Sequence, residues 1–268
     1  MSGFTGFAAL VLYLTCTFAL VLRIQGNQAI ASKPITWLLV PGFLAVAVHA
    51  ISLYYSLISE FGFEFGFFNA ASTIGAVNSL LILMISLKRQ TELLATIVLP
   101  LSAISIALEM IFPGSHMLPP DSSTGLKIHV LVSIVAYSLL GLAALMSIIL
   151  AIQNHLLHNH HPGGLLKHLP PLQTMEKLLF DSITAGFIGL SIALATGFLF
   201  LDNLFAQHLV HKTVLAMIAW LVFGILLVGR LLMGWRGRTA IRWTLSGFVA
   251  LMLAYFGSKF VLEFLITS

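Results

Sequence analysis

Charged residues are scarce in this sequence. Asp, Glu, Lys and Arg make up 8% of its 268 residues and apolar residues make up 59%, whereas ordinary soluble domains carry roughly 25% charged residues. This composition excludes water as the main solvent of the folded chain. Every interval between apolar runs is shorter than the roughly 50 residues of a small domain, so we predict a single integral membrane domain over residues 1–268.

Cysteine is nearly absent too, since Cys16 is the one cysteine in the sequence. A lone cysteine excludes a disulfide framework, a CxxC redox pair and a cysteine metal site. The sequence also lacks a Walker loop, a dinucleotide fingerprint, a nucleophile elbow and a zinc-protease motif. We therefore predict that the protein is not an enzyme with self-contained chemistry.

Long apolar runs dominate what is present. A bilayer core of about 30 Å needs about 20 apolar residues per helix, and eight runs of that kind occur. We predict an all-α polytopic transmembrane helical bundle of about eight helices, in which membrane lipid is the main partner. The runs are Phe4–Leu22, Thr36–Ile58, Phe67–Leu87, Leu93–Phe112, Leu126–Ile152, Leu178–Leu201, Val214–Leu232 and Trp243–Phe264.

Positive charge is distributed unevenly between the loops. Ten of the thirteen Lys and Arg residues lie in or beside the first, third, fifth and seventh loops. The positive-inside rule makes those loops cytoplasmic, so the N-terminus and the C-terminus are both predicted to lie outside. Topology accounts for the net charge of +4, and nucleic acid is not expected as a partner.

The fifth loop, Gln153 to Lys177, is predicted to be the longest. It contains five histidines around a Pro-Gly-Gly sequence, which are His155, His158, His160, His161 and His168. Irregular spacing favours a solvated loop over a metal-binding tract. Residues 165–180 are predicted to form a short amphipathic segment along the inner interface.

Ionisable side chains at membrane depth invite functional hypotheses, because each costs free energy to insert. His49 lies near the middle of the second span, where it is either hydrogen-bonded to a neighbouring helix or engaged in ligation or proton handling. Glu109, near the outer end of the fourth span, is predicted to be interfacial. The third span carries Asn69, Ser72 and Asn78, for which hydrogen bonding between helices is the default interpretation.

His129 begins a polar stripe near the outer end of the fifth span. Offsets of four and eight residues place Ser133 and Tyr137 on the same helical face as His129. This pattern favours a binding role over a histidine that only bridges helices. His116, His208 and His211 are predicted to lie on the same outer side, within possible reach of His129.

Four segments in the second half carry a resemblance to a known family. They run over residues 127–137, 211–220, 234–238 and 253–259, with sequences KIHVLVSIVAY, HKTVLAMIAW, GWRGR and LAYFGSK. In order and spacing they are similar to the CcsA/CcmC/HemX superfamily of cytochrome c assembly membrane proteins, closest to its YpjD-like branch. The match covers about residues 125–265, and within that branch the first half also fits, including His49.

The resemblance implies a bacterial inner-membrane protein that handles heme at the outer leaflet, with histidine axial ligands. His129 sits where the first outer ligand is expected, and His211 and His49 are the alternatives for the second ligand. Tyr137 is predicted to belong to the same cofactor-binding site for a b-type heme. Residues 202–211 contain no tryptophan, whereas the synthetase branches keep a tryptophan-rich motif there, so attachment of heme to apocytochrome is not expected.

The leading prediction is therefore a heme-binding or heme-handling accessory of cytochrome c biogenesis or tetrapyrrole metabolism, acting with heme and with another membrane protein. One alternative is a transporter or transport accessory for another solute or metal, with His49 and Asn78 along the pathway. A second alternative is a structural or regulatory partner of a membrane complex, bound through the turn that holds Arg236 and Arg238.

Overall fold

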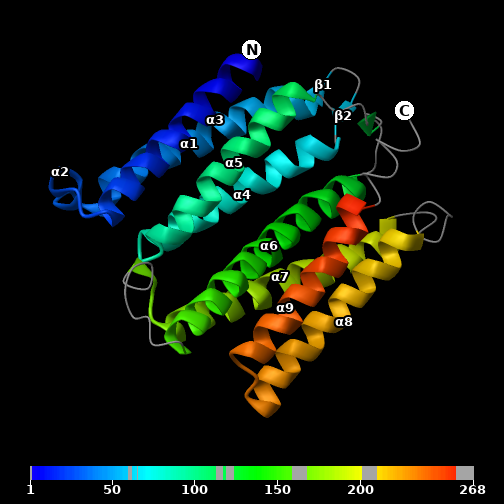
Figure 1. The fold of residues 1–268 in the computed structure, drawn as a ribbon. Coiled ribbons are helices and arrows are strands. Elements are labelled where there is room, and N and C mark those ends of the chain that lie inside the picture. The colour runs from blue at the N-terminus through cyan, green and yellow to red at the C-terminus, as the bar shows by residue number, and fades with distance from the viewer. Residues whose placement is uncertain are drawn as a thin grey trace. The chain divides into compact units, whose positions relative to one another are not determined.

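The computed structural model describes residues 2–59, 62–64, 66–112, 117–118, 124–158, 168–200 and 210–257. Within these ranges, eight helices are long and apolar enough to cross a membrane (Figure 1). The prediction of an all-α, multi-pass membrane protein is confirmed. The orientation of the termini and the single integral domain stay predictions. The chain divides into two compact units. Unit 1 comprises residues 1–121 and 163–170, and unit 2 comprises residues 122–162 and 171–268.

Unit 1 holds the first four spanning helices, which are α1 (Ser2–Ile24), α3 (Ile35–Leu57), α4 (Phe67–Ser86) and α5 (Glu92–Ile111). Helix α1 packs against α3 and α5, and α4 packs against α3 and α5. Small residues permit this close packing, as expected between helices in lipid. A Cβ added at Gly75 of α4 would stand 3.3 Å from the Cα of Ser102 on α5.

One short helix and a small sheet complete unit 1. Helix α2 (Gln28–Ala31) follows α1, and its N-cap Asn27 accepts a hydrogen bond from the backbone amide of Ala29. Strands β1 (Ile58–Ser59), β2 (Gly62–Glu64) and β3 (Met117–Leu118) pair antiparallel, with Phe63 opposite both Ile58 and Leu118. The sheet was not predicted, because runs of two or three residues carry no periodicity.

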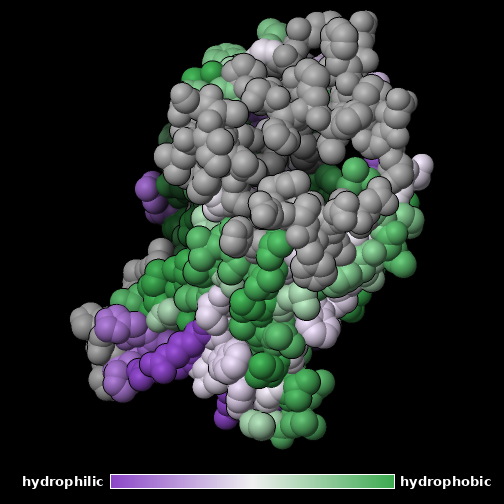
Figure 2. All heavy atoms as spheres, turned by 90° about the vertical axis from the view of Figure 1, so that its right-hand side faces the viewer, coloured by the Kyte–Doolittle hydropathy of each residue, from purple (hydrophilic) through white to green (hydrophobic). Residues whose placement is uncertain are grey.

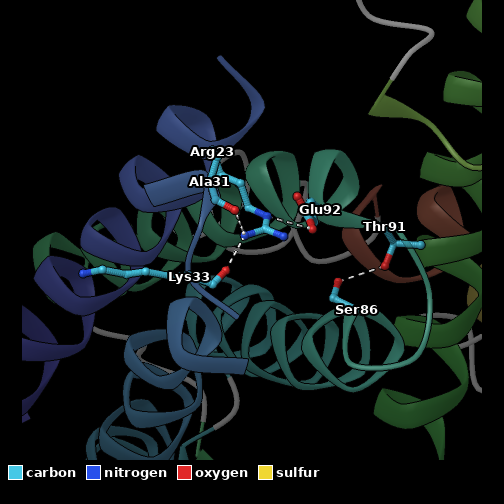
Figure 3. Close-up of polar contacts among 6 residues, drawn as sticks. All are labelled: Arg23, Ala31, Lys33, Ser86, Thr91 and Glu92. Carbon is cyan, nitrogen blue, oxygen red and sulfur yellow. Dashed lines mark hydrogen bonds and ion pairs between the residues drawn. The ribbon is translucent and has the colours of Figure 1, made fainter. Parts of the chain in front are cut away.

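The end of unit 1 that the charge bias predicts to be cytoplasmic is tied together by Arg23 (Figure 3). Its guanidinium donates to the carbonyl oxygens of Lys33 at 2.6 Å and Ala31 at 3.3 Å, and it forms an ion pair with Glu92 at 3.3 Å. The Arg23 side chain thus holds the segment after α1 against the first turn of α5.

Unit 2 consists of α6 (Thr124–His158), α7 (Leu172–Phe200), α8 (Val210–Met233), α9 (Arg238–Met252) and the π-helix η2 (Leu253–Gly257). Helix α6 lies along α7, and α9 packs against α6 and α8 (Figure 1). A Cβ added at Gly189 of α7 would stand 3.0 Å from the Cβ and 3.3 Å from the Cα of Ala136 on α6. Glycine at this position therefore lets the two backbones approach closely.

The prediction for the fifth loop and its flanks was wrong in its boundaries. Helix α6 continues through His158 and α7 begins at Leu172, so residues 172–180 start a spanning helix rather than lying along the interface. His155 and His158 belong to the last turns of α6, while His160 and His161 lie outside the described residues. The predicted end of the helix was placed where the apolar run stops. Residues such as Gln, Asn, Leu and His are compatible with a helix, so the helix continues beyond that run.

The last span also begins earlier than predicted, at Arg238 instead of Trp243, and its predicted end at Phe264 lies outside the described residues. A tight turn precedes it, in which Gly234 and Gly237 have φ values of +67° and +57°. The amide of Gly237 donates to Glu176 of α7 at 2.9 Å, and Arg230 donates to the carbonyl of Trp235 at 3.1 Å. Glycine supplies the positive φ angles that the turn requires.

Large apolar side chains cover much of the outside of the helices. Leu231, Phe4 and Leu199 are 83%, 82% and 76% exposed. Most of the described atoms on the face in Figure 2 belong to hydrophobic residues, with hydrophilic residues gathered toward one end. Apolar exposure on this scale fits helices whose surroundings are lipid rather than water.

Candidate functional site

His129 lies on α6, in the second turn from the end predicted to face outward, and its side chain is partly buried. Its ring nitrogen Nδ1 is 2.8 Å from the carbonyl oxygen of Ala193 and 3.2 Å from Oγ1 of Thr196, both on α7. A carbonyl oxygen can only accept, so Nδ1 carries the proton in this arrangement. The contact orients the ring and fixes its tautomer.

With the proton on Nδ1, the other ring nitrogen, Nε2, keeps its lone pair. Nε2 has no hydrogen-bond partner among the described residues. Histidines that bind metals usually donate their second ring N–H to a carbonyl or carboxylate in this way. The contact with α7 therefore leaves the Nε2 lone pair of His129 unused among the described residues.

Ser133 and Tyr137 extend the polar stripe along α6, as the spacing predicts, but the two side chains differ in their contacts. The Ser133 hydroxyl donates to the carbonyl of His129 at 2.7 Å, so its proton is engaged within its own helix. Tyr137 is 9% exposed, and its buried hydroxyl has no hydrogen-bond partner in the part of the chain that the structure describes. Buried hydroxyls are rarely left without a partner, so the Tyr137 hydroxyl retains an unused hydrogen-bonding capacity.

Aromatic rings surround Tyr137. The centroids of Phe248, Phe256 and Tyr255 lie 5.5, 5.6 and 6.0 Å from that of the Tyr137 ring. Tyr255 and Phe256 belong to η2, and π-helical turns occur frequently at functional sites. Sequence reasoning placed Tyr137 at the site but missed Phe248, because an apolar aromatic residue in an apolar helix gives no signal that sets it apart.

Helix α8 is fixed to α7 by Trp220. Its indole N–H donates to the hydroxyl of Ser191 at 2.8 Å, and its ring stacks on Phe187 with a centroid distance of 5.5 Å and an interplanar angle of 21°. Ser191 precedes Ala193 by two residues. The same stretch of α7 therefore holds both α8 and the His129 ring.

The other outer histidines can be placed only in part. His211 lies in the first turn of α8, but its side chain is outside what the structure describes, and His116 and His208 lie outside the described residues. The prediction of His211 as a second ligand stays a prediction. Among the described residues, no group of three or more His, Cys, Asp or Glu residues is arranged to hold a metal ion.

His49, in unit 1, has both ring nitrogens engaged. Nδ1 lies 3.1 Å from the Tyr13 hydroxyl and Nε2 lies 2.8 Å from the Ser72 hydroxyl, and the side chain is fully buried. These contacts match the alternative in which His49 bonds to neighbouring helices. The prediction that it binds iron stays untested, and ligation would require Nε2 or Nδ1 to give up a hydroxyl partner.

Glu109 departs from its prediction as an interfacial residue. It is 6% exposed, and its Oε1 accepts a hydrogen bond from Ser56 of α3. The sequence places Glu109 close to the end of α5 but does not show that the fold buries it and that Ser56 of α3 bonds it. The expected hydrogen bonding of the third span to other helices is confirmed at Ser72.

Comparison with known proteins gives a consistent picture. The family model described as "Cytochrome C assembly protein" matches residues 37–266. The chain is 29% identical over 225 residues to "Inner membrane protein YpjD" of Escherichia coli (strain K12), covering 83% of this chain and 85% of that one. It is 28% identical over 152 residues to "Cytochrome c biogenesis protein CcsA" of Chlamydomonas reinhardtii, covering 56% of this chain and 42% of that one. No solved structure matches.

Proposed function

The chain belongs to the cytochrome c assembly protein family, and we propose that it is a multi-pass inner-membrane protein that binds heme and passes or regulates it as an accessory to cytochrome c biogenesis or tetrapyrrole metabolism. The names of its relatives support this proposal, since one is an inner membrane protein and others act in cytochrome c biogenesis. The proposed role is not enzymatic. Residues 202–211 lack the tryptophan-rich motif that the synthetase branches of the resembled family keep in this segment.

The observation that carries the proposal is the state of His129. Its Nδ1 is bonded to the Ala193 carbonyl and its Nε2 is left for a ligand. Imidazole is a common axial ligand of heme iron. In the proposed site, His129 would bind the iron through Nε2, and Ala193 and Thr196 orient its ring.

The residues near Tyr137 fit a porphyrin in their chemistry. Phe248, Tyr255 and Phe256 form apolar surroundings of the kind that ligand sites use, and the Tyr137 hydroxyl is an unused hydrogen-bonding group. The bound heme would supply an iron centre, and the protein would set its ligation and its exposure to water. Covalent attachment is not expected because Cys16, the one cysteine, is buried in α1, so the proposed heme is b-type.

For the second axial ligand we propose His211 ahead of His49. His211 is on α8, which Trp220 ties to the same stretch of α7 that orients His129. His49 would have to break a hydrogen bond to a buried hydroxyl, and leaving a buried group unpaired costs about 1–3 kcal/mol.

The experiment is a visible spectrum of the full chain purified from membranes, before and after addition of hemin. A Soret band with bis-histidine features is expected in the wild type and is expected to be lost in His129→Ala. His158→Ala is the matched control, since His158 is an exposed histidine at the other end of the same helix. Added imidazole should restore the band in His129→Gly.

The rival functions predict other outcomes. A protein that neither carries a tetrapyrrole nor changes its spectrum with hemin would contradict the proposal and favour transport of another solute. A structural partner would keep its function in His129→Ala and lose partner capture when Arg236 and Arg238 are both changed to Ala. Both arginines are exposed beside the Gly237 turn.

A further inference from the structure

The turn between α8 and α9 is fixed by contacts on several sides. The ring of Trp235 lies against Gly229 and leaves no room there for a Cβ, and the amide of Trp235 donates to the Gly229 carbonyl at 3.2 Å. Arg230 donates to the carbonyl of Trp235, and Glu176 accepts from the amide of Gly237. The backbone between the two helices is therefore held in one position at an end of unit 2 (Figure 1).

Three arginines extend from this turn into the surroundings of the protein. Arg236, Arg238 and Arg242 are all exposed. Arg238 and Arg242 are four residues apart at the start of α9, so they lie on the same helical face. Among the described residues, the structure gives none of the three side chains a hydrogen bond or an ion pair. Residues 230–242 contain four arginines and no Asp or Glu, so the turn is strongly positive.

Topology alone asks less of these arginines. The positive-inside rule depends on the number of Lys and Arg residues in a loop and not on how their side chains are arranged. Arg23 and Arg230 satisfy that rule while they are engaged within the fold, with Glu92 and with the carbonyl of Trp235. A fixed turn that presents three arginines without partners goes beyond the rule and indicates a surface for a negatively charged group.

The residues beside the arginines place this surface at the depth of the lipid headgroups. Leu231, Leu232 and Met233, which end α8, are 83%, 78% and 70% exposed, as expected of side chains that face acyl chains. Trp235 and Trp243 follow, with ring centroids 5.4 Å apart, and tryptophan is typical of the membrane–water interface. Apolar, aromatic and basic side chains thus succeed one another in the order of acyl chains, interface and headgroups.

We propose that Arg236, Arg238 and Arg242 form a binding site for the phosphate group of an anionic phospholipid in the leaflet that the charge bias predicts to be cytoplasmic. Each guanidinium presents a planar set of donors that matches two oxygens of a phosphate. A zwitterionic lipid brings its own positive group to the arginines, whereas an anionic lipid does not, so the anionic lipid is preferred. The site lies in unit 2 and does not depend on the proposed heme function.

A phospholipid fits this surface better than a water-soluble acidic partner does. The exposed apolar side chains of α8 need a cover of acyl chains, and the arginines at the start of α9 belong to a helix that is apolar enough to span the membrane. One phospholipid molecule supplies both the acyl chains and the phosphate. Its negative charge also offsets the mutual repulsion of the three arginines.

The test measures tryptophan fluorescence of the full chain in phosphatidylcholine vesicles that contain either brominated phosphatidylglycerol or the same amount of brominated phosphatidylcholine. Bromine quenches tryptophan on contact, and Trp235 and Trp243 lie beside the arginines. Trp37, which is 72% exposed in unit 1, is replaced by Phe in every protein so that it does not report. Trp220 lies near the middle of α8 and is expected to be quenched equally by both lipids.

Brominated phosphatidylglycerol is expected to quench at a lower mole fraction than brominated phosphatidylcholine. Its apparent affinity should fall about fivefold for each arginine that is changed to Gln, so Arg238→Gln with Arg242→Gln should remove most of the preference. Arg238→Lys with Arg242→Lys keeps the charge that sets the topology but loses the planar donors. This variant should retain a preference between those of the wild type and of the double Gln variant.

The matched control is Lys88→Gln with Arg89→Gln, which removes two exposed positive charges from the same predicted side, away from this turn. It should leave the preference intact. An equal loss in the control would overturn the proposal, because it would show attraction to general surface charge. Equal quenching by the two lipids in the wild type would also overturn it and would favour an acidic protein as the partner of the turn. None of these readouts depends on heme, and all should be unchanged in His129→Ala.

Discussion

His49 and His129 occupy opposite situations in the two units of the protein. His49 is fully buried in unit 1, and each of its ring nitrogens has a hydroxyl partner from another helix. His129 in unit 2 is partly buried, and only Nδ1 is engaged. The same residue type is thus part of a closed internal network in one unit and retains a nitrogen lone pair for a ligand in the other.

The difference teaches that membrane depth alone does not identify a ligand. A buried histidine is costly in lipid, but hydroxyl partners can meet its needs completely, as Tyr13 and Ser72 do for His49. His129 differs because its Nδ1 is hydrogen-bonded to α7 while its Nε2 has no partner among the described residues. Substitution of each histidine tests this difference.

The largest expected effect comes from exchanging the two histidines for alanine. His129→Ala should lower heme affinity by at least tenfold, in keeping with loss of an axial ligand, and should leave the melting temperature of the heme-free protein nearly unchanged. His49→Ala should do the reverse, keeping the heme but destabilising the fold by about 1–3 kcal/mol, because two buried hydroxyls lose a partner. Hemin titration and thermal unfolding in detergent measure the two effects, and equal heme loss in both variants would break the contrast.

The next effect concerns the close approach of α6 and α7, which places the Ala193 carbonyl against His129. Gly189→Val should destabilise unit 2 by about 1–3 kcal/mol, since its side chain would overlap the backbone of Ala136. It should also weaken heme binding. Gly224→Ala is the matched control, because its Cβ would meet the Phe187 ring at an ordinary 3.5 Å. A Gly189→Val protein with wild-type stability and heme affinity would contradict the role given to this contact.

A smaller effect is expected at Tyr137, whose buried hydroxyl lacks a partner among the described residues. Tyr137→Phe should stabilise the heme-free protein by up to about 1 kcal/mol, because it removes a desolvated hydroxyl. It should lower heme affinity by about fivefold, the equivalent of one hydrogen bond of about 1 kcal/mol. Destabilisation of the heme-free protein would show that the hydroxyl already has a partner within the fold.

The smallest effect is expected from Glu92→Gln at the end of unit 1 shown in Figure 3. The pair with Arg23 is partly exposed, with side chains 24% and 22% accessible, and such pairs contribute about 0.2–1 kcal/mol. Thermal unfolding at low and high salt should show a small loss that salt reduces. A loss as large as that of His49→Ala would mean that Arg23, rather than the buried hydroxyls, holds unit 1 together.

The spans could be predicted from the sequence because apolar length is a local property. The Phe67 start of α4 and the ends of α3 and α5 agree with the predicted runs to within one residue. The end of α6 at His158 could not be predicted in this way, since polar helical turns that leave the membrane resemble loops in composition. Its length became visible only in the folded backbone.

The residues of the candidate site could be predicted from the sequence, but the contacts that they make could not. The spacing placed Tyr137 on the face of His129, which depends only on helical geometry. It could not show that the Ala193 carbonyl fixes the His129 tautomer, since the contact joins residues 64 positions apart. The burial of Glu109 likewise depends on helices that are remote in sequence, so its position near a helix end was misinterpreted.

Helix α6 is too long for the membrane that it crosses. Its 35 residues extend for about 52 Å at 1.5 Å per residue, and at a common tilt of about 20° they still exceed the 40–45 Å thickness of a bilayer with its headgroups. In the orientation predicted from the charge bias, Thr124 begins the helix near the outer surface, so the excess length would emerge on the cytoplasmic side. In that orientation the last turns of α6, which carry the exposed His158, would stand clear of the headgroups and would be accessible to a partner in the cytoplasm.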